Sequence, residues 1–273
     1  MLNNLDANNF IKKSLNKNNS YLIGRSGIVE LRSCFSIYYY QKLSNQLLYL
    51  LQHNAGVYGD CIEAFFYEYT NSITNADMNV FWTQSDLKEV QDILYSKFSP
   101  SSIKFENRAV EPYYFDNPWS SCLKDKKVLV IHPFSESIKY QYKNRNNLWT
   151  QYDILPEFNL ITYRSIQSIN NIGPHNSWIE SLNIMEEEIS NLNFDIALIG
   201  CGAYGLPLGS FIKTKMNKIA IHMGGALQIL FGIKGYRWDN HEEISKMYNS
   251  FWIRPKDNEK PSMYQNIEGG CYW

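Results

Sequence analysis

The sequence lacks the cysteine patterns that build disulfide frameworks or zinc sites. Its five cysteines, at positions 34, 61, 122, 201 and 271, are an odd number, and no two of them form a C-x-x-C pair. Small secreted domains and structural zinc sites need paired cysteines at short, regular spacings. The pattern therefore argues against both classes and favours a protein of the reducing cytoplasm.

Long apolar runs are also missing. The first 20 residues are rich in Asn and Lys and contain no apolar core of the kind that a signal peptide needs. The densest aliphatic cluster, Leu47 to Leu51, is far too short to span a bilayer. We therefore expect no signal peptide and a cytoplasmic location, with peripheral association at the inner face of a membrane left open.

An excess of charge of one sign is absent as well. The chain has 26 Lys and Arg against 27 Asp and Glu, a net charge of −1, and no long basic run. Nucleic-acid-binding proteins need a basic stripe or patch, so nucleic acid is not an expected partner. Aromatic residues, by contrast, are abundant, with 20 Tyr and 7 Trp. Exposed rings suit stacking on sugars or bases, although a codon composition low in G and C explains the same excess.

Apolar runs alternate with helical patterns along the chain. Strands are predicted at residues 21–23, 78–82, 127–131, 159–163, 194–199 and 218–223. Apolar residues recur at helical spacing over 30–52, 62–73, 87–94 and 177–192, and a polar helix is expected over 135–149. Ser177-x-x-Glu180 forms a capping box at the start of the helix over 177–192. This alternation predicts an α/β, Rossmann-like fold with a mostly parallel central sheet and helices on both faces.

The remaining segments carry weaker patterns. Residues 1–20 form a polar lead-in, and residues 102–122 are expected to be irregular with short extended pieces. Because no linker divides the chain clearly, we expect one domain over residues 1–240, with a weak subdivision near residue 120. Residues 241–273 are expected to form a C-terminal helix and an irregular tail.

The densest motif lies between residues 194 and 238. An apolar strand runs into Gly200-Cys201-Gly202-Ala203-Tyr204-Gly205, a helix follows, and a second strand ends at His222-Met223-Gly224-Gly225. The first segment matches G-x-G-x-x-G, but a dinucleotide site needs an acidic residue at the end of the next strand, where this chain has none. A general phosphate or nucleotide site is therefore favoured, with close packing of helix on strand as the alternative. The candidate phosphate-binding glycines are Gly200, Gly202, Gly205, Gly224 and Gly225.

A second constellation follows the first predicted strand, where Arg25, Gly27 and Glu30 surround a turn. The planar fork of an arginine suits a diphosphate, so Arg25 and Gly27 are candidate phosphate-binding residues. Glu30 is a candidate metal ligand or a base acting on a sugar hydroxyl. A capped helix start, with Glu30 near the positive helix end, is the plainer alternative.

Three histidines, His132, His175 and His222, lie at or near predicted strand ends. Strand ends of a parallel sheet converge, so these side chains are candidates for phosphate binding or general-base catalysis, and structural roles are the alternative. No i, i+4 pair of histidines supports zinc.

Residues 224–238 combine glycines with Lys234, Arg237 and Trp238. Two cations beside aromatic rings suit a phosphate joined to a base or sugar, and a helix end with surface cations is the alternative.

These segments resemble the GT-D type of bacterial glycosyltransferase. That family carries an Arg-Phe-Gly-Asp-Gly-Glu motif after its first strand, where this chain has Arg25-Ser26-Gly27-Ile28-Val29-Glu30. Its later Ala-Ile-Asp-Ile-Gly strand is similar to Ala220-Ile221-His222-Met223-Gly224. The acidic residues of the family are related to metal and nucleotide binding, and Ile28 and His222 replace two of them here. The resemblance implies a nucleotide-sugar glycosyltransferase of surface polysaccharide or glycoconjugate assembly, with Mn²⁺ or Mg²⁺ as a possible cofactor.

We therefore predict transfer of a sugar from a nucleoside-diphosphate donor to a glycan or lipid-linked glycan acceptor. Cations would hold the diphosphate, a carboxylate or imidazole would be the base, and aromatic rings would stack on the sugars. The rival hypotheses are a non-catalytic nucleotide- or glycan-binding relative and a histidine-dependent transferase or hydrolase. The residues assigned are Arg25, Lys234 and Arg237 for the diphosphate, Glu30, His132 and His222 for catalysis, and Tyr204, Trp238 and His175 for stacking.

Overall fold

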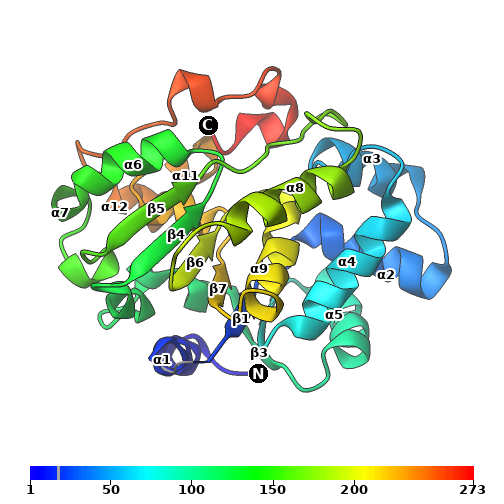
Figure 1. The fold of residues 1–273 in the computed structure, drawn as a ribbon, viewed down its shortest axis with the longest axis horizontal. Helices are drawn as coiled ribbons and strands as arrows, with labels where there is room; N and C mark the ends of the chain where they lie inside the picture. Colours follow the sequence, from blue (N-terminus) through cyan, green and yellow to red (C-terminus); the bar gives the residue numbers. More distant parts are fainter. Residues whose placement is uncertain (17–18) are drawn as a thin grey trace.

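The structure, a computed structural model, describes residues 1–16 and 19–273; residues 17 and 18, in the predicted polar lead-in, lie outside the described residues. Seven strands form one sheet in which every neighbouring pair is parallel (Figure 1). The predicted Rossmann-like α/β fold is confirmed. The strand order is β3-β2-β1-β7-β6-β4-β5. The strands are β1 (Tyr21–Gly24), β2 (Met78–Phe81), β3 (Ile103–Glu106), β4 (Lys127–Ile131), β5 (Asn159–Tyr163), β6 (Ile196–Ile199) and β7 (Ile219–His222).

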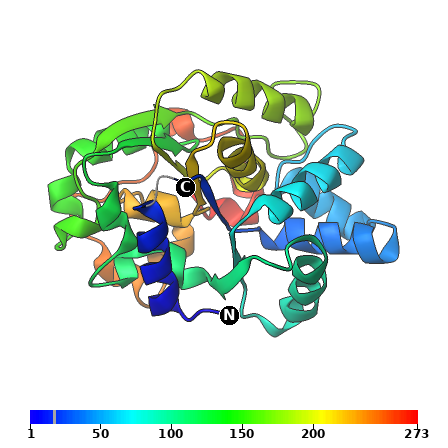
Figure 2. The same cartoon turned by 60° about the horizontal axis from the view of Figure 1, so that its bottom comes forward.

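Helices cover both faces of the sheet because successive strand side chains enter opposite layers. Leu129, for example, packs in one hydrophobic cluster and Val130 in the other. In Figure 2, α1 and α8 lie on opposite sides of the strands. One layer contains α2 (Ile28–Tyr40), α3 (Asn45–His53), α4 (Ile62–Asn75), α5 (Ser85–Phe98), α8 (Trp178–Ser190) and α9 (Gly205–Thr214). The other contains α1 (Asn4–Leu15), α6 (Ser135–Lys143), α7 (Arg145–Leu148), α10 (Ala226–Leu230), α11 (Tyr236–Asp239) and α12 (Ile244–Met247).

Two predicted helices are each divided in two. The pattern over 30–52 becomes α2 and α3, because Gln41 takes a left-handed conformation (φ 56°) and Ser44 caps a new helix. The pattern over 135–149 likewise becomes α6 and α7. The capping-box helix begins as predicted, since Ser177 Oγ accepts the Glu180 N–H at 3.3 Å. Helical spacing of apolar residues therefore does not reveal where a helix ends when the end depends on the backbone conformation of one residue, as at Gln41.

The stretch expected to be irregular contains the edge strand β3, which pairs with β2. Only Phe105 of its four residues is buried, so the strand leaves a short apolar signal. Single 3-10 turns make up much of the rest of that stretch and recur elsewhere. They are η1 (Asn107–Val110), η2 (Pro112–Tyr114), η3 (Trp119–Leu123), η4 (Tyr152–Ile154), η5 (Gly202–Tyr204), η6 (Asp257–Glu259), η7 (Tyr264–Asn266) and η8 (Glu268–Gly270).

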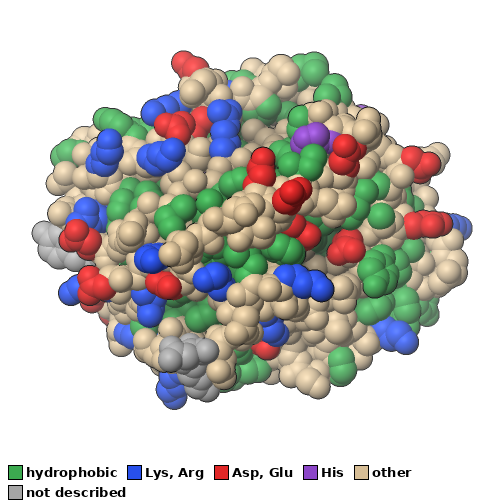
Figure 3. Space-filling model, in the orientation of Figure 1, with side chains coloured by type: hydrophobic (Ala, Val, Ile, Leu, Met, Phe, Trp, Pro, Cys, Tyr) green, Lys and Arg blue, Asp and Glu red, His purple; other side chains and the backbone are tan. Residues whose placement is uncertain are grey.

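The surface carries charges of both signs. Figure 3 shows basic and acidic side chains interspersed over the face seen in Figure 1. Among the described residues, no helix combines the length and the apolar character that crossing a membrane requires.

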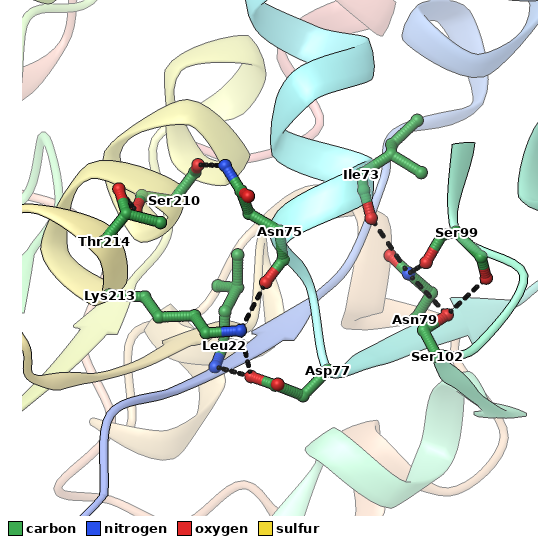
Figure 4. A network of polar contacts seen from close by, with 10 residues as sticks. All are labelled: Leu22, Ile73, Asn75, Asp77, Asn79, Ser99, Ser102, Ser210, Lys213 and Thr214. Atoms are coloured by element: carbon green, nitrogen blue, oxygen red, sulfur yellow. Dashed lines mark hydrogen bonds and ion pairs between the residues drawn. The ribbon is translucent and has the colours of Figure 1, made fainter.

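A polar network fixes the start of β1 against its neighbours (Figure 4). The Asp77 carboxylate accepts the Leu22 N–H at 2.8 Å and pairs with Lys213 Nζ of α9 at 2.7 Å. The same lysine donates to the Asn75 carbonyl at 2.7 Å, and the Asn75 amide donates to Ser210 of α9. Because α9 follows the glycine-rich exit of β6, this network sets the position of that exit relative to β1.

Replacing Asp77 by Ala is expected to lower the free energy of unfolding by about 1–2 kcal/mol, because the Leu22 N–H and Lys213 both lose their acceptor. The control is Asp86→Ala, since the Asp86–Arg32 ion pair is exposed and contributes about 0.5 kcal/mol or less. Urea unfolding of both variants measures the difference. Equal losses would contradict the role given to Asp77.

Candidate functional site

The carboxyl ends of four strands meet at the middle of the sheet. Ile23 of β1 is in register with Ile221 of β7, and Ile199 of β6 pairs with both His222 and Ile131. The loops that follow β1, β7, β6 and β4 are therefore neighbours, although they are far apart in the sequence. This edge of an open α/β sheet is where ligands bind.

A cavity of about 260 Å³ opens at this edge. The loops that contain Arg25, Gly200 and Gly224 all contribute to its wall, so they lie at the same edge of the sheet. The lining also includes residues that no sequence motif marks, from the segments 166–169 and 267–273. The sequence-predicted residues that line it are Arg25, Gly27, Glu30, His132, Gly200, Gly202, Tyr204, His222, Gly224, Gly225 and Arg237.

Arg25 projects from the end of β1 without a carboxylate partner among the described residues. Its Nε donates to the Asn107 amide oxygen at 2.7 Å, and its guanidinium lies 4.6 Å from the Trp82 ring centroid. Gly224 lies directly beside it with φ 58°, and a Cβ at that position would clash with the guanidinium. Arg25 is therefore held at the cavity by neutral direct contacts and forms no ion pair among the described residues, while its charge opposes the rise that burial causes in the pKa of Glu30 and of Glu111.

The N-terminus of α2 faces the same cavity. Its N-cap is Gly27, which has no side chain to cap the first N–H groups of this 13-residue helix, and the Glu30 carboxylate folds back over the helix start. Residues 27–30 line the cavity. These N–H groups and the positive end of the helix dipole attract negative charge, as Arg25 does. Together they form a region suited to an anion.

Glu30 is buried beneath this helix start, with only 7% of its surface exposed. Its carboxylate folds over Gly27, where a Cβ would clash with it. Burial raises the pKa of Glu30 to about 7, and nearby Arg25 only partly offsets the effect. A carboxyl group that titrates near neutral pH is suited to accept a proton from a substrate hydroxyl.

His132 and His222 lie on the cavity wall and are both almost fully buried. Burial lowers the pKa of each imidazole to about 3, so both are neutral at physiological pH. His132 Nδ1 accepts the Phe134 N–H at 3.0 Å, whereas His222 Nδ1 has no partner among the described residues. Such weakly basic imidazoles suit hydrogen bonding to a ligand, and this geometry favours Glu30 over either histidine as a base.

Arg237 lies on α11 and contacts the C-terminal segment, which was predicted to be an irregular tail. It forms an ion pair with Glu268 and donates to the Tyr272 hydroxyl at 2.8 Å. The Arg237 N–H also donates to the Cys271 carbonyl at 2.8 Å. Since Glu268 and Tyr272 line the cavity too, the segment 264–273 closes one side of the site.

Four predicted site residues lie outside the cavity lining. Gly205 packs against the His222 ring, which makes it a close helix–strand contact. Lys234 lies 5.5 Å from the Tyr248 ring centroid, and His175 Nδ1 contacts Ser181 Oγ at 2.9 Å. Trp238 is buried against Gly225 and Tyr272. The structure brings none of these four to the ligand cavity.

Tyr204 lines the cavity but offers no free ring face. It is 2% exposed and stacks on Trp178 at 5.4 Å, while its hydroxyl contacts Ser168 Oγ at 2.8 Å. One face of the ring is covered by Trp178, and the burial of the side chain leaves almost no ring surface for a sugar. The ring is thus better placed for packing than for the predicted sugar contact.

The carboxylates of the cavity are few. Glu30 and Glu268 are the acidic residues in its lining, and Glu268 is paired with Arg237. Among the described residues, no three His, Cys, Asp or Glu side chains converge in the way that a metal site requires. Glu30 alone is a poor site for a hard divalent ion.

The all-parallel sheet and the cavity at its carboxyl edge place the chain in the class of Rossmann-like α/β proteins. The model of a GT-D fold-like domain matches residues 73–230, more than half of the chain. The chain therefore belongs to this glycosyltransferase-like family. No curated protein and no solved structure matches it significantly.

The family match begins within α4 and extends through α10. It includes the exits of β4, β6 and β7 but not Arg25, Glu30 or Arg237. The roles given to those three residues rest on the geometry of the cavity alone.

Glu30→Gln is expected to stabilise the fold at pH 8 and to leave stability unchanged at pH 4. Burial raises the pKa of Glu30 from its ordinary 4.5 to about 7, so the wild type loses stability as the pH rises between these values. The gain is up to about 3 kcal/mol. Denaturant unfolding at both pH values measures it, with the exposed Glu187→Gln as control. A gain that does not depend on pH would contradict this account of Glu30.

Proposed function

We propose that the protein transfers a sugar from a nucleoside-diphosphate donor to a glycan acceptor. The observation that carries the proposal is the Arg25 guanidinium, which forms no ion pair among the described residues and lies beside the Gly224 turn and at the same cavity as the start of α2. A diphosphate would supply the anionic partner that Arg25 lacks among the described residues. Membership of a glycosyltransferase-like family supports the same reaction.

The diphosphate is the leaving group of the reaction, so its negative charge grows as the glycosidic bond to the donor breaks. Hydrogen-bond donors and cations that are already in place around the diphosphate stabilise this charge, because they do not have to reorient during the reaction. Arg25, the α2 N–H groups and the turn at Gly224 and Gly225 are the groups that we assign to this task. The neutral His222 imidazole, which has an unpartnered Nδ1, is a further hydrogen-bonding group on the same wall.

Glu30 is the group that we assign as the base. It would accept the proton of the acceptor hydroxyl as that oxygen attacks the anomeric carbon of the donor sugar. Its pKa of about 7 balances availability as carboxylate against strength as a base. Its burial beside the anion region supports a place close to the reacting atoms.

The acceptor that we propose is a glycan or lipid-linked glycan of a bacterial surface polysaccharide or glycoconjugate. This part rests on the resemblance of residues 25–30 and 220–224 to the GT-D glycosyltransferases. Transfer of radiolabelled sugar to candidate glycan acceptors tests it, and exclusive transfer to an acceptor that is not a glycan would contradict it.

UDP or GDP is expected to raise the melting temperature by about 5 °C or more at a hundredfold excess over Kd. Arg25→Gln should reduce the shift at the same ligand concentration to about half or less, whereas Lys234→Gln, which removes the same charge outside the cavity, should preserve it. Differential scanning fluorimetry measures all three proteins. If common nucleotide sugars and their diphosphates all leave the wild type unshifted, the donor proposal fails.

Glu30→Gln is expected to reduce turnover of the nucleotide sugar at least about 100-fold while diphosphate binding is retained. In the wild type, the rate should fall about tenfold per pH unit below pH 7, as Glu30 becomes protonated. Release of nucleoside diphosphate measures both effects. Tight binding with no turnover by the wild type would instead favour a non-catalytic relative, and an unchanged rate in the variant would exclude Glu30 as the base.

A further inference from the structure

We infer that two arginines, Arg25 and Arg237, neutralise the donor diphosphate in place of a divalent cation. The inference rests on the proposed function and names the groups that neutralise the negative charge of the diphosphate. It departs from the Mn²⁺ or Mg²⁺ that the GT-D resemblance implies.

The donor set of the cavity does not suit a hard cation. Mg²⁺ and Mn²⁺ bind carboxylate and carbonyl oxygens, generally with more than one acidic residue. Here Ile28 and His222 occupy positions at which the similar GT-D glycosyltransferases have acidic residues. The two carboxylates of the cavity lining, Glu30 and Glu268, already have contacts within the protein. Glu30 lies folded against Gly27, and Glu268 is already paired with Arg237.

The cavity supplies positive charge of its own. Arg25 and Arg237 both line it, and the positive end of α2 adds to them. Burial raises the pKa of Tyr272 to about 12, and both arginines oppose that rise. The contacts agree, because Arg25 lies against Gly224, the next residue, Gly225, lies against the Tyr272 ring, and Arg237 donates to the Tyr272 hydroxyl at 2.8 Å. A dication would be repelled by this pair, whereas a diphosphate would be attracted by it.

The two arginines differ in how they are held. Arg25 makes direct contacts with the neutral side chains of Asn107 and Trp82 and forms no ion pair among the described residues, so a phosphate can become its partner. Arg237 is paired with Glu268, and the two side chains are 39% and 38% exposed. Because an exposed pair is weak, a phosphate can replace Glu268 as the partner of Arg237. Glu268 thus competes with the donor, and its removal should strengthen donor binding.

Isothermal titration of UDP, GDP and inorganic pyrophosphate into EDTA-treated protein tests the inference, with and without added Mn²⁺. The Kd of the wild type is expected to change less than about threefold with the metal. Arg25→Gln and Arg237→Gln should each weaken binding about tenfold or more, which corresponds to the loss of one charged hydrogen bond. Glu268→Gln should tighten it a few-fold, and Lys234→Gln is the charge-matched control.

The outcomes separate the two proposals. Nucleoside diphosphates that bind only with Mn²⁺, or an Arg237→Gln variant with unchanged Kd, would overturn the two-arginine site and leave the proposed function standing. Arginine-dependent binding of pyrophosphate without binding of any nucleotide would support the anion site and contradict the nucleotide donor. If none of the three ligands binds under either condition, both proposals are wrong.

Discussion

The parallel pairing of β1 with β7 is the contact on which the site depends. Tyr21, Leu22 and Ile23 are in register with residues 219–221, nearly 200 positions later in the chain. This register brings the Arg25 turn beside Gly224. The Asp77–Lys213 pair and the Asp77–Leu22 hydrogen bond hold the same strand against α9 at its other end. A one-residue slip would turn Leu22 and Ile23 to the wrong layers and move Arg25 away from the cavity.

Burial gives each group at this edge a different electrostatic character. The two histidines become neutral hydrogen-bonding groups, and Glu30 becomes a carboxyl group that titrates near pH 7. Arg25 forms no ion pair among the described residues, although the carboxyls of Glu30 and Glu111 lie near it. The result is a cavity with one arginine outside any ion pair of the described residues, a poised base and few ligands for a metal ion. Those three properties together suit transfer chemistry with an anionic leaving group.

The fold was accessible from the sequence because buried parallel strands leave apolar runs, as in residues 127–131 and 218–223. The edge strand β3 left only a short signal, since Phe105 alone is buried there. The break between α2 and α3 depends on the left-handed backbone of Gln41, which apolar spacing does not encode. Local pattern thus predicts elements better than it predicts their interruptions.

The site was predicted in part. Glycine-rich strand exits mark the loops at the sheet edge, which is why Arg25, Gly200 and Gly224 were found. Gly205 carried the same signal yet serves packing against His222, since sequence alone cannot separate approach to a ligand from approach to a side chain. Asn107 and Trp82 reach the site through tertiary contacts only. Glu268 and Tyr272 lie in a segment with no periodicity, so no local pattern identifies them.

The most direct measurement is a crystal structure of the protein with a nucleoside diphosphate bound. The account predicts that the diphosphate lies between Arg25 and the turn at Gly224 and Gly225, close to the N-terminus of α2. A diphosphate bound away from the carboxyl edge of β1 and β7, or one that leaves Arg25 without a phosphate contact, would contradict it.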